Sequence, residues 1–340
     1  MLISDVNELQ QMGGLPKRDI VVARKYSPDN DVTLATKDCL KFMADIPDHS
    51  AALVFTSPPY NIGKEYEPRL SLDEYRRTMR DVIAESVRVV RPGGSICFQV
   101  GNFMAGPQRP RPLAFILDPL FLEYEKTHGL TLRNAIVWHF EHGQHANLRF
   151  SGRYEMILWY TKGDNYVFNL DEVRVPQKYP GKRHHKGPKK GEYSGNPKGK
   201  NPGDVWIDIP NVKSNHIEKT EHPCQFPVGL AKRVILAMTN LGDLVIDPFC
   251  GVGSTAVAAV LTDRRVATCD LVSDYIATAR ERVKSAANGT LKIRENKPIH
   301  VRSPTDADAK VPDGFWTDID ESLASNALIK ANCEAKPAIV

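Results

Sequence analysis

Apolar runs that alternate with amphipathic stretches constrain the fold of this chain more than any other feature. Residues 51–55 read Ala-Ala-Leu-Val-Phe, and a run without polar positions is typical of a strand buried on both faces of a parallel sheet. The same alternation recurs from residue 32 to residue 287, which favours strand–helix–strand units joined by right-handed crossovers. The sequence therefore predicts an α/β fold with a doubly wound, mostly parallel sheet.

The period of the apolar residues gives the individual elements. Strands are expected at 32–35, 51–55, 95–100, 132–140, 154–161, 244–246 and 265–269. Helices are expected at 40–46, 72–90, 112–128, 228–240, 254–262 and 273–287. The segment Arg91-Pro92-Gly93-Gly94 is expected to separate a helix from the strand that follows it.

Composition divides the chain into five parts. They are an N-terminal extension (1–31), a first αβ half (32–170), an inserted region (171–221), a second αβ half (222–294) and a C-terminal tail (295–340). The inserted region is crowded with proline, glycine and lysine, and the tail has few periodic apolar residues. One large α/β domain with an inserted region therefore accounts for the 340 residues.

Charge and composition exclude several classes of protein. The formal net charge is only +4, no apolar stretch approaches the roughly 20 residues of a membrane span, and the first residues lack a signal-peptide pattern. We therefore expect a cytoplasmic protein without a membrane partner. The cysteines show no metal-ligand spacing, so we expect reduced thiols and no metal; they are Cys39, Cys97, Cys224, Cys250, Cys269 and Cys333.

A glycine-containing loop follows the expected strand 244–246. Its sequence is Asp-Pro-Phe-Cys-Gly-Val-Gly-Ser-Thr, and Gly251 and Gly253 permit a ligand to approach the backbone closely. Ser254 or Thr255 can cap the helix that starts there. Many structural turns contain two glycines, but this one belongs to a strand–loop–helix–strand unit, which favours a nucleoside site.

The ligand of that loop is expected to lack phosphate groups. Asp270 ends the next strand, about where dinucleotide folds present a carboxylate to ribose hydroxyls. The complete GxGxxG fingerprint and the P-loop ending are both absent. A ligand with ammonium and carboxylate groups instead needs backbone donors and an acid such as Asp247.

The loop after the run 51–55 carries the sharpest chemistry. Ser57-Pro58-Pro59-Tyr60 follows the strand directly, and its prolines stop both ladder and helix. The Ser57 hydroxyl and the Pro58 carbonyl can accept both N–H groups of an amino substituent on an aromatic base, whose lone pair is otherwise delocalised. Tyr60 offers a flat face to a base that has left the duplex. An isolated Ser-Pro-Pro-Tyr is more often a rigid turn, but the nucleoside loop in the same chain favours catalysis.

With both loops considered, the chain resembles the β-type amino-directed DNA methyltransferases, which act on cytosine N4 or adenine N6. The similarity covers roughly residues 32–287, through the segments Thr56–Asn61, Asp247–Gly253, Val89–Gly94 and His222–Pro223 with Phe226–Pro227. It implies a Rossmann-like fold, a catalytic half (32–170), a target-recognition region (171–221) and a cofactor-binding half (222–294).

The resemblance also implies the ligands. S-adenosylmethionine is the expected cofactor and double-stranded DNA the expected substrate, with a cognate restriction endonuclease and a homodimer among the partners such enzymes have. The expected cofactor-binding residues are Asp38, Asp247, Phe249, Cys250, Gly251, Gly253, Ser254, Thr255 and Asp270. Asp38 would contact the adenine amino group, although a helix-capping aspartate explains that residue equally well.

The target base is the first open alternative. In this family a serine at the first motif position is usual for cytosine-N4 enzymes, so Ser57 favours cytosine N4 over adenine N6. The Pro-Cys-Gln string at 223–225 occurs in cytosine-C5 enzymes, where the cysteine attacks the ring. That chemistry would leave the Ser57 loop without a role and would require the cofactor loop to precede Cys224, so we do not favour it.

The inserted region carries a run of basic residues with few acids. Its expected DNA contacts are Lys178, Lys182, Arg183, Lys186, Lys189, Lys190, Lys198 and Lys200. Tyr179 and Tyr193 are interleaved with them. A solvated linker is the ordinary explanation of such a run, but its place between the two chemical loops favours target recognition. RNA amino-methylation and a non-catalytic DNA-binding protein remain as alternative functions.

Overall fold

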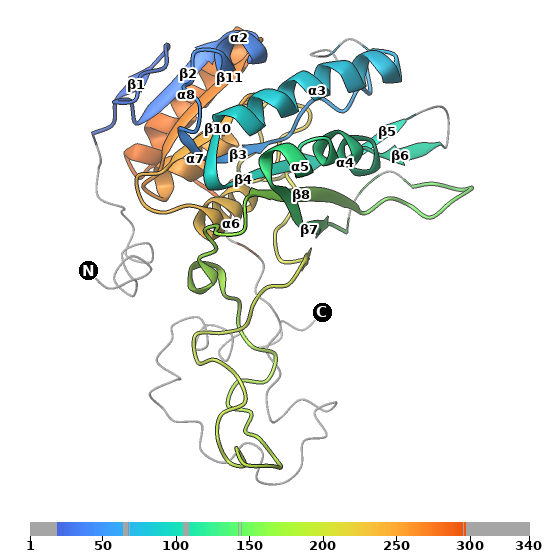
Figure 1. Cartoon of the computed structure of the whole chain (residues 1–340), viewed down its shortest axis with the longest axis vertical. Helices are drawn as coiled ribbons and strands as arrows, with labels where there is room; N and C mark the ends of the chain where they lie inside the picture. Colours follow the sequence, from blue (N-terminus) through green and yellow to red (C-terminus); the bar gives the residue numbers. More distant parts are fainter. Residues whose placement is uncertain are drawn as a thin grey trace. The chain divides into compact units, whose positions relative to one another are not determined.

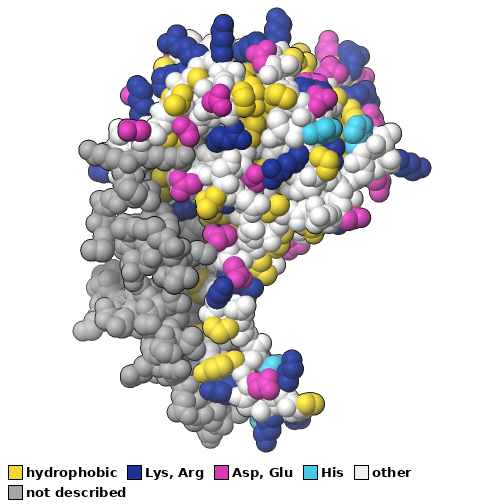
Figure 2. Space-filling view, turned by 60° about the vertical axis from the view of Figure 1, so that its left-hand side comes forward, with side chains coloured by type: hydrophobic (Ala, Val, Ile, Leu, Met, Phe, Trp, Pro, Cys, Tyr) yellow, Lys and Arg dark blue, Asp and Glu magenta, His cyan; other side chains and the backbone are white. Residues whose placement is uncertain are grey.

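The computed structural model describes residues 19–63, 67, 69–104, 109–141, 143, 145–294 and 296. The chain forms two compact units, of which the first comprises 19–169 with 204–294 and the second contains Leu170–Gly203. Residues 204–221, which the sequence placed in the inserted region, therefore pack with the first unit. Lys and Arg side chains are exposed on both units (Figure 2). The functional boundaries stay predictions, and the expected tail lies almost entirely outside the described residues.

A nine-stranded sheet forms the centre of the first unit (Figure 1). In spatial order its strands are β1 (Val22–Ala23), β2 (Val32–Thr36), β11 (Arg265–Asp270), β10 (Leu244–Asp247), β3 (Ala51–Thr56), β4 (Val90–Val100), β8 (Tyr154–Lys162), β7 (Leu130–His139) and β9 (Val205–Trp206). Only β8 runs antiparallel to its neighbours within this described sheet. The prediction of a mostly parallel sheet is confirmed. A separate ribbon pairs β5 (Asn102–Met104) with β6 (Pro110–Pro112).

Helices cover both faces of the sheet, which confirms the doubly wound architecture (Figure 1). One face carries α2 (Cys39–Met43), α3 (Leu72–Val89) and α4 (Ala114–Leu122), which is followed by α5 (Glu125–His128). The other carries α6 (Val228–Met238), α7 (Ser254–Leu261) and α8 (Ser273–Ala287). Every helix in the described ranges is too short or too polar to cross a bilayer. A short 3-10 helix spans Leu170–Val173.

Side chains that are removed from water explain why these elements form. The strand β3 is buried along its whole length, as the apolar run predicts. The helix α3 begins with a capping box, in which the Ser71 hydroxyl accepts from the Glu74 N–H and the Glu74 carboxylate accepts from the Ser71 N–H. Its buried face, including Met79 and Ile83, packs in the same core cluster as Phe98 of β4.

Two predicted elements differ from the structure. The expected helix 112–128 is split into α4 and α5, because the Tyr124 N–H bonds back to the Phe121 carbonyl three residues earlier and interrupts the helical ladder. The expected break at 91–94 is instead part of β4, which bulges against β3. Gly93 has φ +76°, and a Cβ at Gly94 would lie 2.8 Å from the Ala52 carbonyl oxygen, so glycine permits the bulge.

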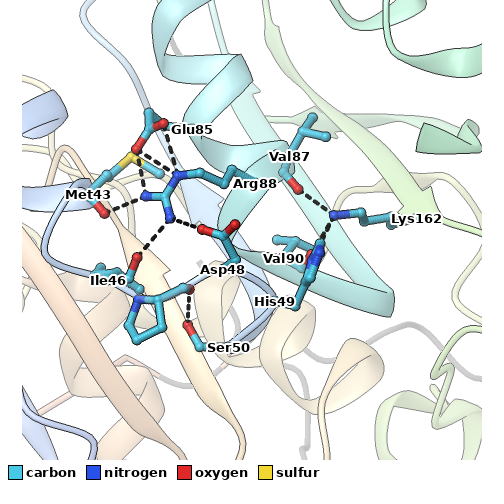
Figure 3. A network of polar contacts seen from close by, with 11 residues as sticks. Met43, Ile46, Asp48, His49, Ser50, Glu85, Val87, Arg88, Val90 and Lys162 are labelled. Carbon is cyan, nitrogen blue, oxygen red and sulfur yellow. Dashed lines mark hydrogen bonds and ion pairs between the residues drawn. The ribbon is translucent and has the colours of Figure 1, made fainter. Parts of the chain in front are cut away.

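Polar contacts close the amino ends of β3 and β4, opposite the edge where ligands bind in such sheets (Figure 3). Arg88, near the end of α3, donates to the carbonyl oxygens of Met43 (2.7 Å), the last residue of α2, and of Ile46 (2.9 Å) in the loop after it. The Lys162 ammonium, at the end of β8, donates to the Val90 carbonyl at 2.9 Å. The contacts fix α2, α3 and the end of β8 against one another at this edge of the sheet.

Candidate active site

The strands β3 and β10 lie side by side in the sheet, and their outgoing connections lead to opposite sides. The chain passes from β3 to β4 on one side and from β10 to β11 on the other. Ligands bind at such a switch point, beyond the carboxyl ends of the strands. A cavity lies there, and the loops after both strands line it. Ser57 and Gly251 therefore share one cavity wall.

Ten of the thirteen predicted catalytic and cofactor-binding residues line this cavity. They are Asp38, Ser57, Pro58, Pro59, Tyr60, Phe249, Cys250, Gly251, Ser254 and Asp270. Three predicted cofactor residues, Asp247, Gly253 and Thr255, are not part of its wall. Their side chains or backbone serve the packing beneath the loop instead, as the following contacts show.

Asp247 is completely buried at the end of β10. Its Oδ1 accepts hydrogen bonds from the Thr56 hydroxyl at 2.6 Å and from the Phe249 N–H at 3.1 Å. Burial raises the pKa of its carboxyl to about 6. Through Oδ1 the carboxyl joins the two loops, and direct contact between Asp247 and a ligand stays a prediction.

Gly253 and Thr255 lie where α7 packs. Gly253 has φ +80°, and a Cβ there would lie 2.7 Å from Ala279 Cβ, so this glycine permits contact with α8. Thr255 is fully buried in α7. The expected helix cap is also wrong, because the Ser254 hydroxyl donates to the Phe226 carbonyl at 2.8 Å and Gly253 occupies the N-cap position.

Asp270 fixes the cofactor loop from the end of the neighbouring strand β11. Its Oδ2 accepts from the Gly251 N–H at 2.8 Å, and its Oδ1 accepts from the Val272 N–H at 2.9 Å. Burial raises the pKa of this carboxyl. Each carboxylate oxygen keeps a lone pair that can accept from a hydroxyl in the cavity.

The structure shows one of the two interpretations of Asp38, the helix cap. Its carboxylate caps α2 by accepting from the Lys41 N–H at 3.1 Å, and the residue also lines the cavity. The helix-capping role is therefore present in the structure. Contact with an adenine amino group stays a prediction.

The loop 57–60, predicted to be catalytic, is held by hydrogen bonds at its serine and tyrosine. The Ser57 hydroxyl donates to the Tyr60 hydroxyl oxygen at 3.2 Å. Because its proton is directed at Tyr60, the lone pairs of Ser57 remain available as acceptors. The Pro59 carbonyl accepts from the Tyr75 hydroxyl at 2.9 Å, which ties the loop to α3.

Asn61, the last residue of the matching segment Thr56–Asn61, and Glu67, which the sequence does not indicate, hold the end of this loop. Asn61, at φ +56°, exchanges two hydrogen bonds with the Leu70 backbone, at 2.9 and 2.7 Å. The buried Glu67 carboxylate accepts from the N–H groups of Asn61 (3.0 Å) and Ile62 (2.8 Å). An asparagine after two prolines signals a left-handed turn, but nothing local signals the role of Glu67.

Further cavity residues were also missed. They are Lys37, Cys39, His222, Cys224, Gln225, Phe226, Pro248, Val252, Leu271, Val272 and Tyr275. His222 packs edge-on against the Tyr275 ring, with 4.6 Å between the ring centroids. Burial lowers the pKa of His222 to about 4, so its imidazole is neutral at pH 7. Cys224, the cysteine of the Pro-Cys-Gln string, lies in the same wall.

The predicted basic residues belong to the second unit. Seven of the eight are exposed, and Arg183 is partly buried. Its guanidinium stacks on the Tyr193 ring at 4.1 Å, while the Lys198 ammonium pairs with Asp171 at 2.7 Å. These two cations are thus already engaged, and DNA contact by the whole set stays a prediction.

Comparison with known proteins shows the family to which the chain belongs. The profile of the N6/N4 DNA methylase family matches residues 51–281, which is more than half of the chain. The type II methyltransferase M.BglII of Bacillus subtilis is 45% identical over 242 residues, covering 71% of this chain and 66% of that protein. M.ScaI of Streptomyces caespitosus, also a type II methyltransferase, is 34% identical and the match covers 78% and 86% of the two chains.

Solved structures share the fold. The cytosine-N4-specific PvuII DNA methyltransferase superposes with a TM-score of 0.58 at 18% identity, covering 81% of this chain and 95% of that one. A Thermus thermophilus protein, described as a candidate DNA modification methylase and solved with S-adenosyl-L-methionine, gives 0.51 at 25% identity, covering 75% and 96%. By the family match and the 34% identity to M.ScaI, this chain belongs to the N6/N4 DNA methylase family and is an enzyme that methylates amino groups of DNA bases.

Proposed function

We propose that this enzyme transfers a methyl group from S-adenosylmethionine to the exocyclic N4 of cytosine in double-stranded DNA. The observation that carries the proposal is the shared cavity of Ser57 and Gly251. A loop suited to holding an amino group and a loop suited to holding a nucleoside meet at one switch point, so the two reactants can be brought into contact there.

The residues of the cavity fit S-adenosylmethionine. The carboxylate of Asp270 lies at the wall beside the Gly251 backbone, where it can accept from ribose hydroxyls. The aromatic rings of Phe249 and Tyr275 provide apolar surface for an adenine. When bound, the sulfonium of this cofactor supplies an electrophilic methyl carbon.

The chain's own contribution is to hold and orient the amino group. The Ser57 oxygen and the Pro58 carbonyl each accept one N–H of the base, which favours the tetrahedral nitrogen of the transition state. The stiff proline backbone fixes these acceptors before the substrate arrives. The Tyr60 ring lines the same cavity and can stack on a base that has rotated out of the duplex.

The serine of the loop supports cytosine over adenine. In the amino-directed family a serine at this first position is usual for cytosine-N4 enzymes, and Ser57 lies in the cavity wall. Adenine N6 is the second candidate because a 31% identical relative from Escherichia coli is named a DNA adenine methyltransferase. Both bases present the same delocalised amino group, so the two candidates use the same residues.

Identification of the methylated nucleoside decides between them. Unmethylated duplex DNA is incubated with the enzyme and S-adenosylmethionine, digested to nucleosides and separated by mass spectrometry against standards. N4-methyldeoxycytidine is the expected product. N6-methyldeoxyadenosine would replace the proposal by its second candidate, and a C5-methylated cytosine would contradict both. Duplex RNA of the same sequence, run in parallel, should remain unmethylated.

The partners follow from the same proposal. The basic residues of the second unit, above all Lys186, Lys189 and Lys190, are proposed to contact DNA phosphates. Because M.BglII and M.ScaI are named type II methyltransferases, we propose that this enzyme protects DNA from a cognate restriction endonuclease. A homodimer stays a prediction.

A further inference from the structure

A carboxylate from outside the predicted loops reaches the catalytic tyrosine. Glu155 lies near the start of β8, which pairs antiparallel with β4. The Tyr60 hydroxyl lies 3.3 Å from Glu155 Oε2 and 3.2 Å from Gln99 Oε1, both of which can accept its proton. The Gln99 amide nitrogen also donates to Glu155 Oε2. Two strands far from the catalytic loop in sequence therefore hold its tyrosine.

The backbone leaves room for this contact. A Cβ at Gly101, just after β4, would lie 2.7 Å from Tyr60 Cε2 and 3.2 Å from Glu155 Oε1. Any other residue at position 101 would push the ring and the carboxylate away. Glycine at this position therefore permits the approach of Tyr60 to Glu155.

The hydrogen bonds of Ser57 and Tyr60 form a chain in which each hydroxyl donates to the next acceptor, toward Glu155. The Ser57 hydroxyl donates to the Tyr60 oxygen at 3.2 Å, and the Tyr60 hydroxyl can donate in turn to Glu155. The chain of hydrogen bonds begins at the residue that accepts the substrate amino group in the proposed function and ends at a carboxylate. Such a chain can move a proton in steps without moving a heavy atom.

We propose that Glu155 is the positioning residue of the catalytic loop and that, through Tyr60 and Ser57, it receives the proton that the amino group loses on methylation. The inference rests on the proposed amino-methylation, but not on which of the two bases is methylated.

The proton transfer balances the methylation. The amino nitrogen forms its bond to the methyl carbon with its lone pair, and the electron pair of the broken carbon–sulfur bond stays on sulfur. The nitrogen then carries a positive charge and releases one proton to Ser57 Oγ. The Ser57 hydroxyl proton passes to the Tyr60 oxygen, and the Tyr60 proton passes to Glu155. Ser57 and Tyr60 end unchanged, while Glu155 ends neutral.

The pKa shifts of Glu155 and Tyr60 are consistent with their roles as proton acceptor and proton relay. Burial raises the pKa of Glu155 to about 7, so the carboxylate is a competent proton acceptor near neutral pH. Burial and the nearby Glu155 charge hold the pKa of Tyr60 well above its usual range, so Tyr60 passes a proton on rather than persisting as an anion. The groups facing this chain of hydrogen bonds are the Gln99 amide and, toward Tyr60, the Cys224 thiol.

The test compares wild type with Glu155→Gln in single-turnover methylation of duplex DNA between about pH 5.5 and pH 9. The amide keeps the shape and can still accept from Tyr60, but it cannot take up a proton. We expect the wild-type rate to rise with pH through about 7, and the variant rate to be at least about tenfold lower at pH 8 and without that rise. The matched control is Glu281→Gln on the exposed side of α8, which should keep both rate and profile.

Two further measurements separate proton transfer from structure. S-adenosylmethionine affinity by calorimetry should be unchanged in Glu155→Gln. Tyr60→Phe keeps the ring but removes the relaying hydroxyl, so it should lose the rate to a similar extent, and the double variant should be no slower than either single variant. A wild-type rate and pH profile in Glu155→Gln, or multiplying effects in the double variant, would overturn the inference. If the wild type itself methylated no DNA, the proposed function would fail first.

Discussion

The Thr56 hydroxyl donates a hydrogen bond of 2.6 Å to the Asp247 carboxylate, across 191 positions of sequence. Thr56 ends β3, Asp247 ends β10, and both side chains are fully buried. The bond therefore joins the strand that carries the catalytic loop to the strand that carries the cofactor loop. It fixes, relative to each other, the ends of the two strands from which these loops start.

The buried Asp247 makes the stability of the enzyme depend on pH. Its folded pKa of about 6 lies above the value of about 3.9 for an unfolded aspartate. As pH rises, the unfolded chain therefore loses this proton first, and the folded state loses stability between about pH 4 and pH 6. In Asp247→Asn the amide oxygen can keep both hydrogen bonds and the pH-dependent loss disappears. Relative to wild type, the variant should gain on the order of 3 kcal/mol between those limits.

Urea unfolding of both proteins at intervals from pH 4 to pH 8 measures this difference. The exposed Asp81→Asn on α3 serves as the control and should track the wild type. A constant difference between Asp247→Asn and wild type over the whole range would show that Asp247 is ionised in the folded protein throughout.

We expect a side chain at Gly251 to have two effects: it strains the backbone, and it weakens cofactor binding. It has φ +49°, and a Cβ there would lie 3.2 Å from His222 Nε2 in the cavity wall. Gly242 has φ +75° with no atom within 4 Å of such a Cβ. Alanine at position 242 therefore strains the backbone as alanine at 251 does, but makes no contact with a neighbouring side chain. Each alanine variant should lose about 1–2 kcal/mol of stability. Only Gly251→Ala should also lose S-adenosylmethionine affinity, by about tenfold or more in calorimetry.

Equal cofactor affinities in Gly251→Ala and Gly242→Ala would place the ligand away from this loop. Chemical denaturation of the same samples shows whether the two substitutions are matched in strain, which the comparison requires.

The sequence predicts the sheet and the place of the site because both depend on local patterns. A strand buried on both faces must be a continuous apolar run, as in 51–55, and the carboxyl ends of parallel strands share one edge. The two-residue strands β1 and β9 carry too short a pattern to be recognised. The bulge in β4 was missed because it depends on how Gly94 faces the neighbouring strand.

Contacts between distant strands are what the sequence does not reveal at the site. Asp247 follows a strand as a ligand-binding acid would, and no local pattern shows that its carboxylate also accepts from the Thr56 hydroxyl, 191 positions away. Glu155 reaches Tyr60 because β8 pairs antiparallel with β4, and no local pattern reveals that register. The cavity-lining loops could therefore be predicted, while the residues that hold those loops could not.

Cys224 tests the ring-attack alternative directly, since it lies in the cavity wall. In the proposed mechanism no thiolate is needed, so Cys224→Ala should retain methyl transfer. Ser57→Ala should lose at least about a hundredfold, because it removes an acceptor of the amino group in the transition state. Initial rates with labelled S-adenosylmethionine give both values. Near-complete loss in Cys224→Ala with a folded protein would restore the cytosine-C5 alternative.

The basic residues of the second unit predict a salt-dependent contribution to DNA binding. Lys186, Lys189 and Lys190 are exposed in one short stretch, and each phosphate that a lysine neutralises adds about 0.9 to the slope of log affinity against log salt. Changing all three to glutamine should weaken DNA binding and flatten that slope by up to about 3. Fluorescence anisotropy of a labelled duplex at several salt concentrations measures both effects. A triple glutamine variant at the exposed Lys25, Lys126 and Lys284 of the first unit is the control for net charge alone. An equal change of slope in the two variants would mean that the inserted segment contributes only its charge, because position would then not matter.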